Sequence, residues 1–598
     1  MLATPSLARS SLALALLFVG CGPSSTAMPA PDGGAPDAAP DAAVLTIDAA
    51  VPPEDAGPLD CVEPGLYREQ TLTVGAEERF YLLFVPERVA CETAAPLWID
   101  LHGTAGDRPE EAYGLEAQLA IAEREGVVLV RPRSRFSSVG GGPLYRWDQN
   151  AGDLDRNGDF VAALVEALRR RQAIDPERVY LSGFSSGTNM SSQILARGDL
   201  RITGLGVVAG GVWSDATFPP LSSSRLRVYA TSGYRDYLHY ALDRLLDELA
   251  SAGLPADRVL VRETDSGHDL YGWQYEEMWA WLDEGVRAEP GTLAPGWSFE
   301  REPVDGAPSL LAIAASASGE LLAVGARSTA WRRGLDGTWR ESERPASSAS
   351  LVDVCVSASG VALATGDGQL FRSTDGGARW EADGRVRDPG GAMLGYAHLN
   401  ALSCAPEGSV LGAGYWVGLR SDDDLRTYSA MPITRTFGDV EYAGQIAALG
   451  RSSEGTVLAV GYYALVSRRG DEDARFEAID LDVEGEWVLD VDAGPARSWW
   501  IVGDGGALAR STDDGRSFVP QDSGTEADLY AIDMDESGEG FAAGRDGTVL
   551  WTTDGGARWE PIPTGLSGFV GDIRRVAPGR AIAVGEAGAI LAFDAAGR

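Results

Sequence analysis

Short apolar runs alternate with segments of helical periodicity over the first half of the chain. The runs that predict buried strands are residues 80–85, 97–101, 127–130, 179–182, 206–209, 228–231 and 259–261. Apolar residues recur at helical spacing in residues 160–171, 189–197, 238–252 and 276–284. Continuous apolar strands are typical of a mostly parallel sheet that helices cover on both faces. We therefore predict an α/β fold, with helices on both faces of the sheet, over residues 59–290.

A different pattern begins after the Pro- and Gly-rich junction at residues 289–296. Helical periodicity disappears, and a short apolar strand ending in glycine repeats. The repeated glycines are Gly325, Gly366, Gly414, Gly461, Gly503, Gly544 and Gly585. A unit of roughly 40 to 50 residues that contains several short strands is typical of a β-propeller blade. We predict an all-β propeller of seven blades over residues 296–598, closed by residues 296–299, which supply the outer strand that the last repeat lacks.

A recurring turn follows the strand that comes after the repeated glycine in several repeats. It is clearest in residues 373–380 and 552–559, which read Ser/Thr-Thr-Asp-Gly-Gly-Ala-Arg-Trp. This turn resembles the Asp box (S-x-D-x-G-x-x-W) of sialidase-like, sortilin-like and photosystem assembly-factor-like propellers. The resemblance implies that the Ser and Asp bind the backbone of their own hairpin and that the Trp packs between blades. The motif marks the fold, so we expect a binding or scaffolding ring of unknown ligand, with a catalytic ring as the alternative.

The N-terminus has the features of an exported protein. Residues 1–9 carry one positive charge, and residues 10–20 form an apolar stretch too short to span a bilayer. We predict a signal peptide over residues 1–20. Residues 17–21 (Leu-Phe-Val-Gly-Cys) resemble a bacterial lipobox, although Phe18 stands where Leu is usual, and the resemblance implies lipid attachment at Cys21. An ordinary secretory signal is the alternative, and both place the protein outside the cytoplasm, anchored at the cell envelope or surface, or secreted.

Residues 21–58 consist mainly of Pro, Ala, Asp and Gly. Residues 22–58 carry six acids and no basic residue, which predicts a disordered spacer. Four cysteines remain beyond Cys21, and export favours their pairing. Cys61 with Cys91 and Cys355 with Cys404 are the candidate pairs. Buried free thiols are an equal alternative for the second pair.

The charge of the chain excludes two classes of partner. Asp and Glu number 88 against 50 Lys and Arg, so the net charge is −38. Nucleic-acid binding needs a basic face, and an anionic lipid surface would repel this chain. We therefore expect no nucleic-acid partner, and membrane attachment only through the lipid on Cys21.

The chemistry of the first domain centres on Ser185. The sequence Gly-Phe-Ser-Ser-Gly at residues 183–187 lies between the predicted strand 179–182 and the predicted helix 189–197. A G-x-S-x-G at such a junction is a nucleophile elbow, a tight turn that exposes the serine hydroxyl above the sheet edge. Ser185 is therefore the candidate nucleophile. The amide of Ser186 and an amide from residues 101–104, for which we choose Thr104, are the candidate oxyanion hole.

The base comes from only four histidines: His102, His239, His268 and His398. His268 follows the nucleophile in the loop after strand 259–261, so it is the best candidate. Asp236 directly follows strand 228–231 and fits best as the acid that orients His268, while Asp215 after the preceding strand is the alternative. The chain order serine, acid, histidine is that of an α/β-hydrolase.

Residues 153–159 (Asp-Leu-Asp-Arg-Asn-Gly-Asp) have the spacing of a calcium loop. However, Leu164 stands at the twelfth position, where a bidentate acid is needed. We therefore favour an N-cap role for Asp159 at a helix start and predict no metal and no cofactor.

Several of these motifs together resemble the polyhydroxybutyrate depolymerase and feruloyl esterase group of α/β-hydrolases over roughly residues 59–289. They are residues 81–86, 102–104, Trp147 ahead of 159–161, 175–180 leading to the elbow and Met190, and Gly267-His268. The resemblance implies ester hydrolysis through an acyl-enzyme on Ser185, with His268 as base and Asp236 orienting it. Thr188 and Asn189 replace the small residue usual after the elbow.

The sequence thus predicts a surface-tethered serine carboxylic-ester hydrolase. Its substrate is an ester, expected to be an extracellular polymer ester or its fragments, and the propeller is a binding or scaffold domain. The alternative is a non-catalytic cell-surface binding protein with a remnant hydrolase domain.

Overall fold

The computed structural model describes residues 46–48 and 61–597, with internal gaps. The gaps are 138–143, 148–150, 214–215, 287–291, 305–306, 345–346, 348, 367, 386–398, 406–407, 416, 432, 438–439, 444, 463–464, 471–475, 480 and 482–487. The predicted signal peptide, Cys21, Asp215 and His398 lie outside the described residues, as does the spacer apart from Thr46–Asp48. No helix among the described residues has the length and apolarity needed to cross a membrane.

Contacts within the chain divide it into two compact units. The first comprises residues up to Ser232, Leu238–Arg262 and Asp269–Arg287. The second comprises Gly233–Tyr237, Glu263–His268 and Ala288–Arg598. Two short segments that the sequence places within the hydrolase region therefore group with the propeller.

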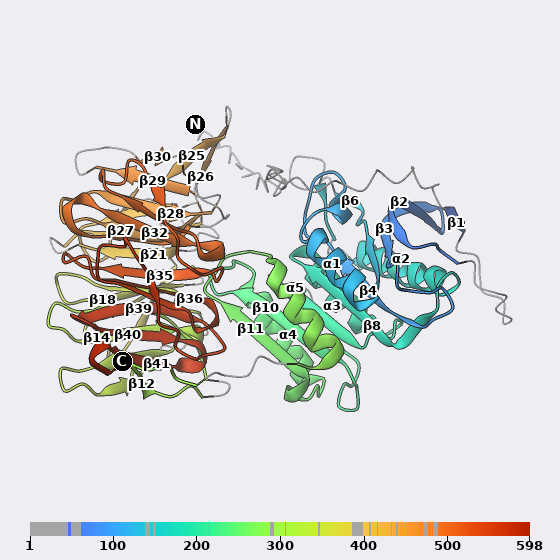
Figure 1. The fold of residues 1–598 in the computed structure, drawn as a ribbon, viewed down its shortest axis with the longest axis horizontal. Coiled ribbons are helices and arrows are strands. Elements are labelled where there is room, and N and C mark those ends of the chain that lie inside the picture. The colour runs from blue at the N-terminus through green and yellow to red at the C-terminus, as the bar shows by residue number, and fades with distance from the viewer. Residues whose placement is uncertain are drawn as a thin grey trace, which may run out of the picture. The chain divides into compact units, whose positions relative to one another are not determined.

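The sheet associated with the first unit has nine strands in the order β1-β2-β3-β5-β4-β8-β9-β10-β11 (Figure 1). They are β1 Thr46–Asp48, β2 Gly65–Val74, β3 Glu77–Val85, β4 Ala95–Leu101, β5 Val128–Pro132, β8 Ile174–Phe184, β9 Gly204–Val208, β10 Arg227–Gly233 and β11 Val259–Thr264. Pairing is parallel from β5 through β4, β8 and β9 to β10, and antiparallel at β2, β3 and β5. β6 Phe136–Ser137 and β7 Leu144–Tyr145 form a small separate hairpin.

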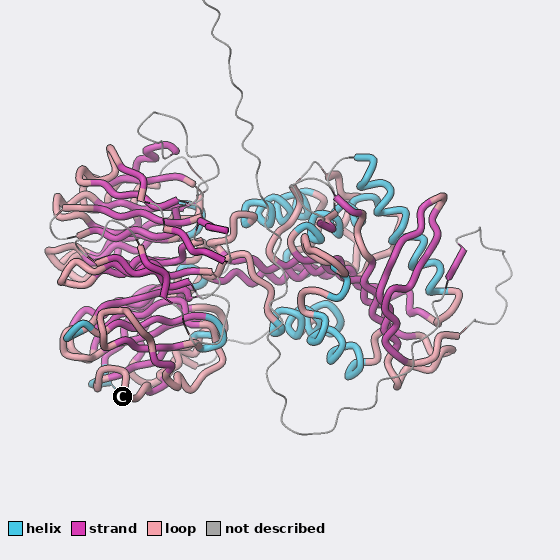
Figure 2. The backbone as a smooth tube through the Cα atoms, turned by 90° about the horizontal axis from the view of Figure 1, so that it is seen from above, coloured by secondary structure: helices cyan, strands magenta, loops and turns pink. Residues whose placement is uncertain are grey.

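Alternate side chains of the central strands enter two separate apolar cores. In β4, Leu97 and Ile99 pack with α2, α3 and α4, whereas Trp98 packs with α1 and α5 on the other face. Figure 2 shows the helices above and below the sheet. The helices are α1 Leu115–Glu125, α2 Ala151–Arg169, α3 Ser186–Arg197, α4 His239–Ser251 and α5 Gly272–Trp279, with short turns at η1 Pro109–Glu111, η2 Ala256–Arg258 and η3 Ala280–Glu284. This arrangement confirms the predicted α/β class.

The second unit contains seven antiparallel sheets of four strands, one for each predicted blade. The strands are β13 Leu310–Ala315 to β16 Trp339–Glu341, β17 Asp353–Val356 to β20 Glu381–Arg385, β21 Leu399–Cys404 to β24 Ser429–Ala430, β27 Ile446–Arg451 to β30 Glu477–Ile479, β31 Val488–Ala493 to β34 Val519–Pro520, β35 Leu529–Met534 to β38 Glu560–Pro561, and β39 Val570–Ala577, β40 Arg580–Gly585 and β41 Ile590–Asp594 with β12 Trp297–Arg301. β25 Thr434–Phe437 and β26 Val440–Ala443 form an extra hairpin.

The ring closes between its two ends. β12 pairs antiparallel with β41, with Trp297 opposite Phe593. The N-terminal strand therefore completes the last blade, as residues 296–299 predict. The first strands of neighbouring blades lie against one another around the ring, including β13 against β39. The predicted seven-bladed propeller is confirmed.

The second strand of most blades ends in glycine for a steric reason. A Cβ at Gly544 would lie 1.9 Å from the carbonyl oxygen of Asp528, and one at Gly366 would lie 1.7 Å from that of Ser350. Both neighbours lie just before the first strand of the same blade. Since no side chain fits in that space, the repeat retains a residue without one.

The Asp boxes act on their own hairpins, as the resemblance implies. Asp375 accepts from the amide of Arg379 and from the Ser373 hydroxyl, each at 2.9 Å. These bonds lower the pKa of Asp375, since they favour the ionised carboxylate. Trp380 is buried in a cluster that includes residues of the preceding blade, such as Leu322. The motif therefore serves the fold.

Buried aspartates link the first strands of neighbouring blades. The Asp353 carboxylate accepts from the amide of Leu402 at 2.6 Å, and the Asp572 carboxylate accepts from the amide of Ile313 at 2.8 Å. The same kind of link comes from Asp490, Asp492 and Asp533. Burial raises the pKa of Asp353 to about 6 and that of Asp572 to about 7, because removal from water disfavours the charged form.

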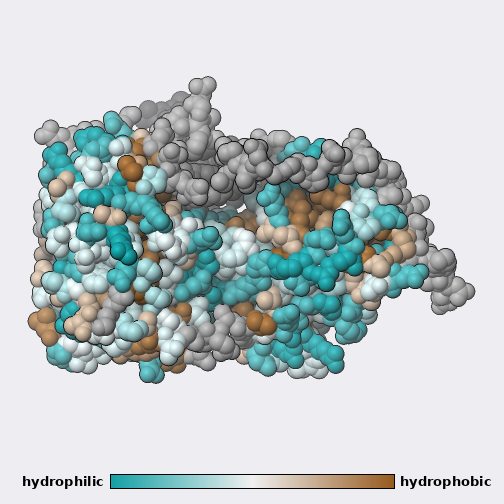
Figure 3. Space-filling model, viewed as in Figure 1, coloured by the Kyte–Doolittle hydropathy of each residue, from teal (hydrophilic) through white to brown (hydrophobic). Residues whose placement is uncertain are grey.

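Disulfides join Cys61 to Cys91 and Cys355 to Cys404, with Cα atoms 5.6 and 5.8 Å apart. The second bond links the first strands of two adjacent blades. On the face drawn in Figure 3, hydrophilic side chains prevail over the described surface. Large apolar residues exposed among the described residues are few and scattered in sequence, for example Phe136, Leu335 and Val519.

The steric role of the repeat glycine predicts the effect of a single methyl group. Gly544→Ala should lower the free energy of unfolding by about 1–3 kcal/mol, because the Cβ would overlap a backbone carbonyl that cannot move freely. Gly412→Ala is the matched control, since its Cβ would meet only Leu side chains at 3.5 Å or more. Calorimetric melting of both variants measures the difference. Equal melting temperatures would contradict the steric explanation.

The buried aspartates predict a pH dependence of stability. Asp572 has a pKa of about 7 in the folded ring and an ordinary value of 3.8 in the unfolded chain. The folded state therefore binds more protons between these values, so the stabilisation from this group is complete below pH 3.8 and is lost as pH rises through about 7. The free energy of unfolding in urea should decrease from about pH 5 to about pH 8, and this decrease should be smaller for Asp572→Asn than for the wild type. An unchanged pH dependence in the variant would count against this explanation.

Candidate functional site

Ser185 lies at a sharp turn between β8, which ends at Phe184, and α3, which begins at Ser186. Its φ of 51° and ψ of −117° are strained for a residue with a side chain. The turn needs glycine on both sides: a Cβ at Gly187 would lie 2.0 Å from the Leu101 carbonyl oxygen, and one at Gly183 would lie 2.4 Å from the Gly187 backbone. These are the features of a nucleophile elbow.

The loop after β4 lies beside the elbow. A Cβ at Gly103 would lie 3.3 Å from Ser185 Cβ and 2.7 Å from Phe184 Cδ1. The Tyr113 hydroxyl donates to the carbonyl of Thr104 at 2.7 Å and holds this loop from outside. The loop after β4 therefore packs directly against Phe184 and Ser185.

His102 is a structural residue. Its Nε2 accepts from the amide of Ser134 at 3.0 Å, and its Nδ1 lies 2.6 Å from the carbonyl oxygen of Gly103. This pattern assigns the proton to Nδ1. Complete burial lowers the pKa of His102 to about 3, so the ring stays neutral and has no free nitrogen for proton transfer.

A buried polar network that the sequence analysis missed lies under the same sheet edge. Arg131 Nε donates to Asp100 Oδ2 at 3.0 Å, and both side chains are 1% exposed. The Ser182 hydroxyl donates to Asp100 Oδ1 at 2.6 Å and accepts from Trp98 Nε1 at 2.8 Å. Since Asp100 precedes His102 and Ser182 precedes the elbow, this network ties the two strands that carry the site. The sequence does contain a signal for this network, because each of the two apolar strands β4 and β5 includes one charged residue.

His268 and Asp236 lie together in the second unit. His268 Nδ1 is 2.9 Å from Asp236 Oδ1 and 3.0 Å from Oδ2. The Asp236 side chain is fully buried, whereas that of His268 is 14% exposed. A carboxylate at Nδ1 fixes the tautomer, so Nε2 is the nitrogen that can accept a proton. The ring of Tyr237 packs on the imidazole at a centroid distance of 4.9 Å.

The two residues after the elbow that depart from the family pattern are both buried and hydrogen-bonded. Thr188 Oγ1 donates to the carbonyl of Ser185 at 2.6 Å. Asn189 Oδ1 accepts from the amide of Trp213 at 2.9 Å. These bonds hold the backbone of Ser185 and the loop after β9, which explains polar residues at positions where the resemblance implies a small one.

The predicted N-cap role of Asp159 is wrong. α2 already begins at Ala151, so Asp153–Asp159 lie inside a helix and cannot form a calcium loop. Asp159 instead pairs with Arg197 at 2.7 Å. The calcium spacing thus comes from acids on a solvent-facing helix.

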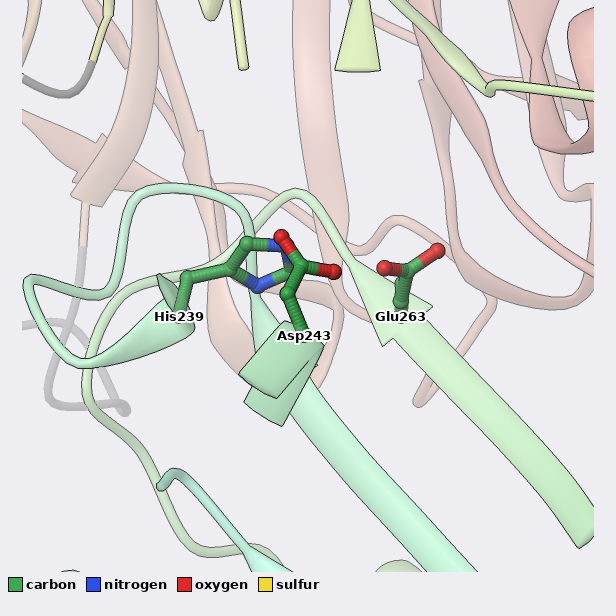
Figure 4. A group of neighbouring side chains, drawn as sticks. All are labelled: His239, Asp243 and Glu263. Atoms are coloured by element: carbon green, nitrogen blue, oxygen red, sulfur yellow. The ribbon is translucent and has the colours of Figure 1, made fainter. Parts of the chain in front are cut away.

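His239 and Asp243 lie one turn apart on α4, and Glu263 lies in β11 (Figure 4). The hydroxyl of Tyr234 donates to the Glu263 carboxylate. The His239 side chain is buried at the start of α4.

Two family models match the chain. The model of the family described as esterase PHB depolymerase matches residues 79–266. The model described as photosynthesis system II assembly factor YCF48 matches residues 465–598. The predicted combination of a depolymerase-group esterase domain and an assembly-factor-like propeller is therefore confirmed.

Three curated relatives match part of the chain. A putative esterase, NocK, of Nocardia uniformis subsp. tsuyamanensis is 30% identical over 207 residues, 34% of this chain and 56% of that protein. Poly(3-hydroxyalkanoate) depolymerase C of Paucimonas lemoignei is 28% identical over 126 residues, 21% of this chain and 30% of that protein. A bifunctional acetylxylan esterase/xylanase of Neocallimastix patriciarum is 30% identical over 105 residues, 18% of this chain and 14% of that protein. The chain thus spans about half or less of each of these relatives.

Solved structures resemble about half of the chain. YCF48 bound to D1 peptide has a TM-score of 0.41 and 17% identity, over 51% of this chain and 99% of that one. Virginiamycin B lyase from Staphylococcus aureus has a TM-score of 0.42 and 14% identity, over 50% of this chain and 99% of that one. The number of blades here rests on the strand pairing described above.

The close contact at Gly103 predicts how sensitive Ser185 is to its neighbour. Gly103→Ala would push on Phe184 and Ser185, and should slow the labelling of the serine by a fluorophosphonate probe by roughly tenfold or more, since small displacements of reacting groups are costly. Gly106→Ala in the same loop is the control, because its Cβ meets nothing within 4 Å. Equal labelling rates for the two variants would contradict a tight fit around Ser185.

Proposed function

We propose that this protein is a serine carboxylic-ester hydrolase. The observation that carries the proposal is the hydrogen bond between His268 and Asp236, because a serine nucleophile needs a base whose imidazole is held by a carboxylate. The strained turn at Ser185 and the match of residues 79–266 to an esterase family support it.

The proposed reaction has two steps through an acyl-enzyme. His268 Nε2 takes the Ser185 hydroxyl proton while Oγ attacks the ester carbonyl carbon, and Asp236 stabilises the imidazolium. The amides of Ser186 and Thr104 hold the oxyanion until the C–O bond breaks and the imidazolium protonates the departing alcohol. Water then attacks the acyl-enzyme with His268 as base, which releases the acid and restores Ser185.

The location and substrate are also proposed. Residues 1–20 are a signal peptide, a lipid on Cys21 anchors the protein at the envelope or surface, and residues 21–58 are a spacer. The hydrolase domain then spans residues 59–290 and the propeller residues 296–598. Because the relatives include enzymes named for a polyester and for acetylxylan, we favour a polymer ester or its fragments as substrate. The propeller is a binding or scaffold domain.

A direct test replaces the nucleophile. Ser185→Ala in the exported chain should lower p-nitrophenyl butyrate hydrolysis by roughly a thousandfold or more, because the acyl-enzyme cannot form. Ser186→Ala is the matched control, since only its backbone amide has a proposed role.

A fluorophosphonate probe should label the wild type and Ser186→Ala but not Ser185→Ala. Undiminished turnover by Ser185→Ala would remove Ser185 as nucleophile. Folded wild type that neither reacts with the probe nor hydrolyses the ester would favour the alternative, a non-catalytic binding protein.

A further inference from the structure

Two loops of the hydrolase region form one hydrogen-bonded body in the second unit. These are Gly233–Tyr237, which carries Asp236, and Glu263–His268. The amide of Tyr234 donates to the carbonyl of Thr264 at 2.9 Å, and that of Arg235 donates to Ser266 at 3.0 Å. The two loops therefore move together, and whatever holds one also holds the other.

Tyr234 packs into an apolar cluster at the inner part of the ring. Every one of the seven blades contributes to this cluster, for example through Leu311, Ala447 and Phe569. Tyr234 is 3% exposed, and its ring centroid lies 6.2 Å from that of Phe569. Tyr237, next to Asp236, lies 5.9 Å from the ring of Tyr415. Aromatic side chains thus anchor this loop among residues that only a closed ring brings together.

Arg235 adds polar contacts to two neighbouring blades. Its Nη1 donates to the carbonyls of Asn400 in β21 and Ala447 in β27, each at 3.0 Å. Its Nε and Nη2 donate to the two oxygens of Asp265, again at 3.0 Å. A planar guanidinium can satisfy a carboxylate and two carbonyls at once, which an ammonium group cannot.

The charge of the surroundings favours a cation at this position. Burial opposes the charge, but Asp265, Asp353 and Asp490 together raise the pKa of Arg235. Asp353 and Asp490 are the first-strand aspartates that also link neighbouring blades. The ring therefore places two backbone carbonyls and two aspartates, Asp353 and Asp490, around Arg235.

We propose that Arg235 is a positioning residue through which the propeller holds the acid and base of the hydrolase. The proposal rests on the function proposed above. Arg235 directly precedes Asp236, and its partner Asp265 lies three residues before His268. The ion pair therefore fixes the carboxylate and the imidazole relative to each other, so the ring is part of the catalytic framework in addition to any ligand that it binds.

The test uses full-length variants of one side chain. Arg235→Met keeps the length of the side chain and removes the ion pair and both carbonyl contacts. We expect kcat for p-nitrophenyl butyrate to fall at least tenfold with KM changed less than twofold. Arg235→Lys should give an intermediate loss.

Arg333→Met is the matched control. Arg333 forms a bidentate pair with Glu300 at 2.9 Å within the same ring, away from both loops in sequence. It should keep the wild-type kcat and KM within twofold. An Arg235→Met protein with the kcat of the wild type would overturn the proposal.

A second measurement does not depend on turnover. Carbon-13 labelling of the histidine Cε1 atoms gives an NMR signal for His268, assigned with His268→Gln. In Arg235→Met the chemical shift of this signal should change, because the ring loses its fixed hydrogen bond to Asp236. If that variant does not fold, the signal of Arg235→Lys decides. An unchanged chemical shift overturns the positioning role, whereas a changed chemical shift in a protein that hydrolyses no ester supports it and overturns the proposed function instead.

Discussion

Close approach of two backbone segments at glycine is the constraint on which both units depend. At the elbow, Gly187 lets α3 start against the carbonyl of Leu101, where a Cβ would lie at 2.0 Å. In the ring, Gly544 lies against the carbonyl of Asp528, where a Cβ would lie at 1.9 Å. The first contact lies two residues after the strained turn at Ser185, and the second lies between the first two strands of a blade. Neither position tolerates a side chain, for the same steric reason.

Buried polar groups are the second shared device. In the first unit, Asp100 and Arg131 pair beneath the elbow and are both 1% exposed. In the second unit, aspartates such as Asp572 accept backbone amides of the next blade. A buried carboxylate is costly unless bonded, and a pair broken at one partner leaves an uncompensated charge. Such groups therefore permit one register of neighbouring strands and penalise the alternatives.

The sequence predicts those features that rest on local pattern. Seven strands of the first sheet, four of its helices and the blade repeat all have a pattern that extends over many residues, so it can be recognised in the sequence. Helix α1 and strand β2 were missed, because their inward residues, such as Gln118 in α1 and Gln70 in β2, are not all apolar. The N-cap role predicted for Asp159 was wrong for a similar reason. The first two turns of α2 contain few apolar residues, so in the sequence they resemble a loop.

The candidate site could be predicted as residue types in chain order, but not as contacts. Order and placement after strands select Ser185, Asp236 and His268, and only coordinates reveal the bond between the last two. No local pattern could reveal Arg235, because its partners lie 30, 165 and 212 residues away.

A loop after a sheet strand usually takes its shape from its own sheet. Here the loop bearing Asp236 is held by carbonyls and aromatic rings of a closed ring, and the ring closes only when residues near 297 and 593 pair. The placement of Asp236 and His268 therefore depends on strand pairing between residues almost three hundred positions apart. These two loops belong structurally with the ring, although the sequence places them among the strands of the first sheet.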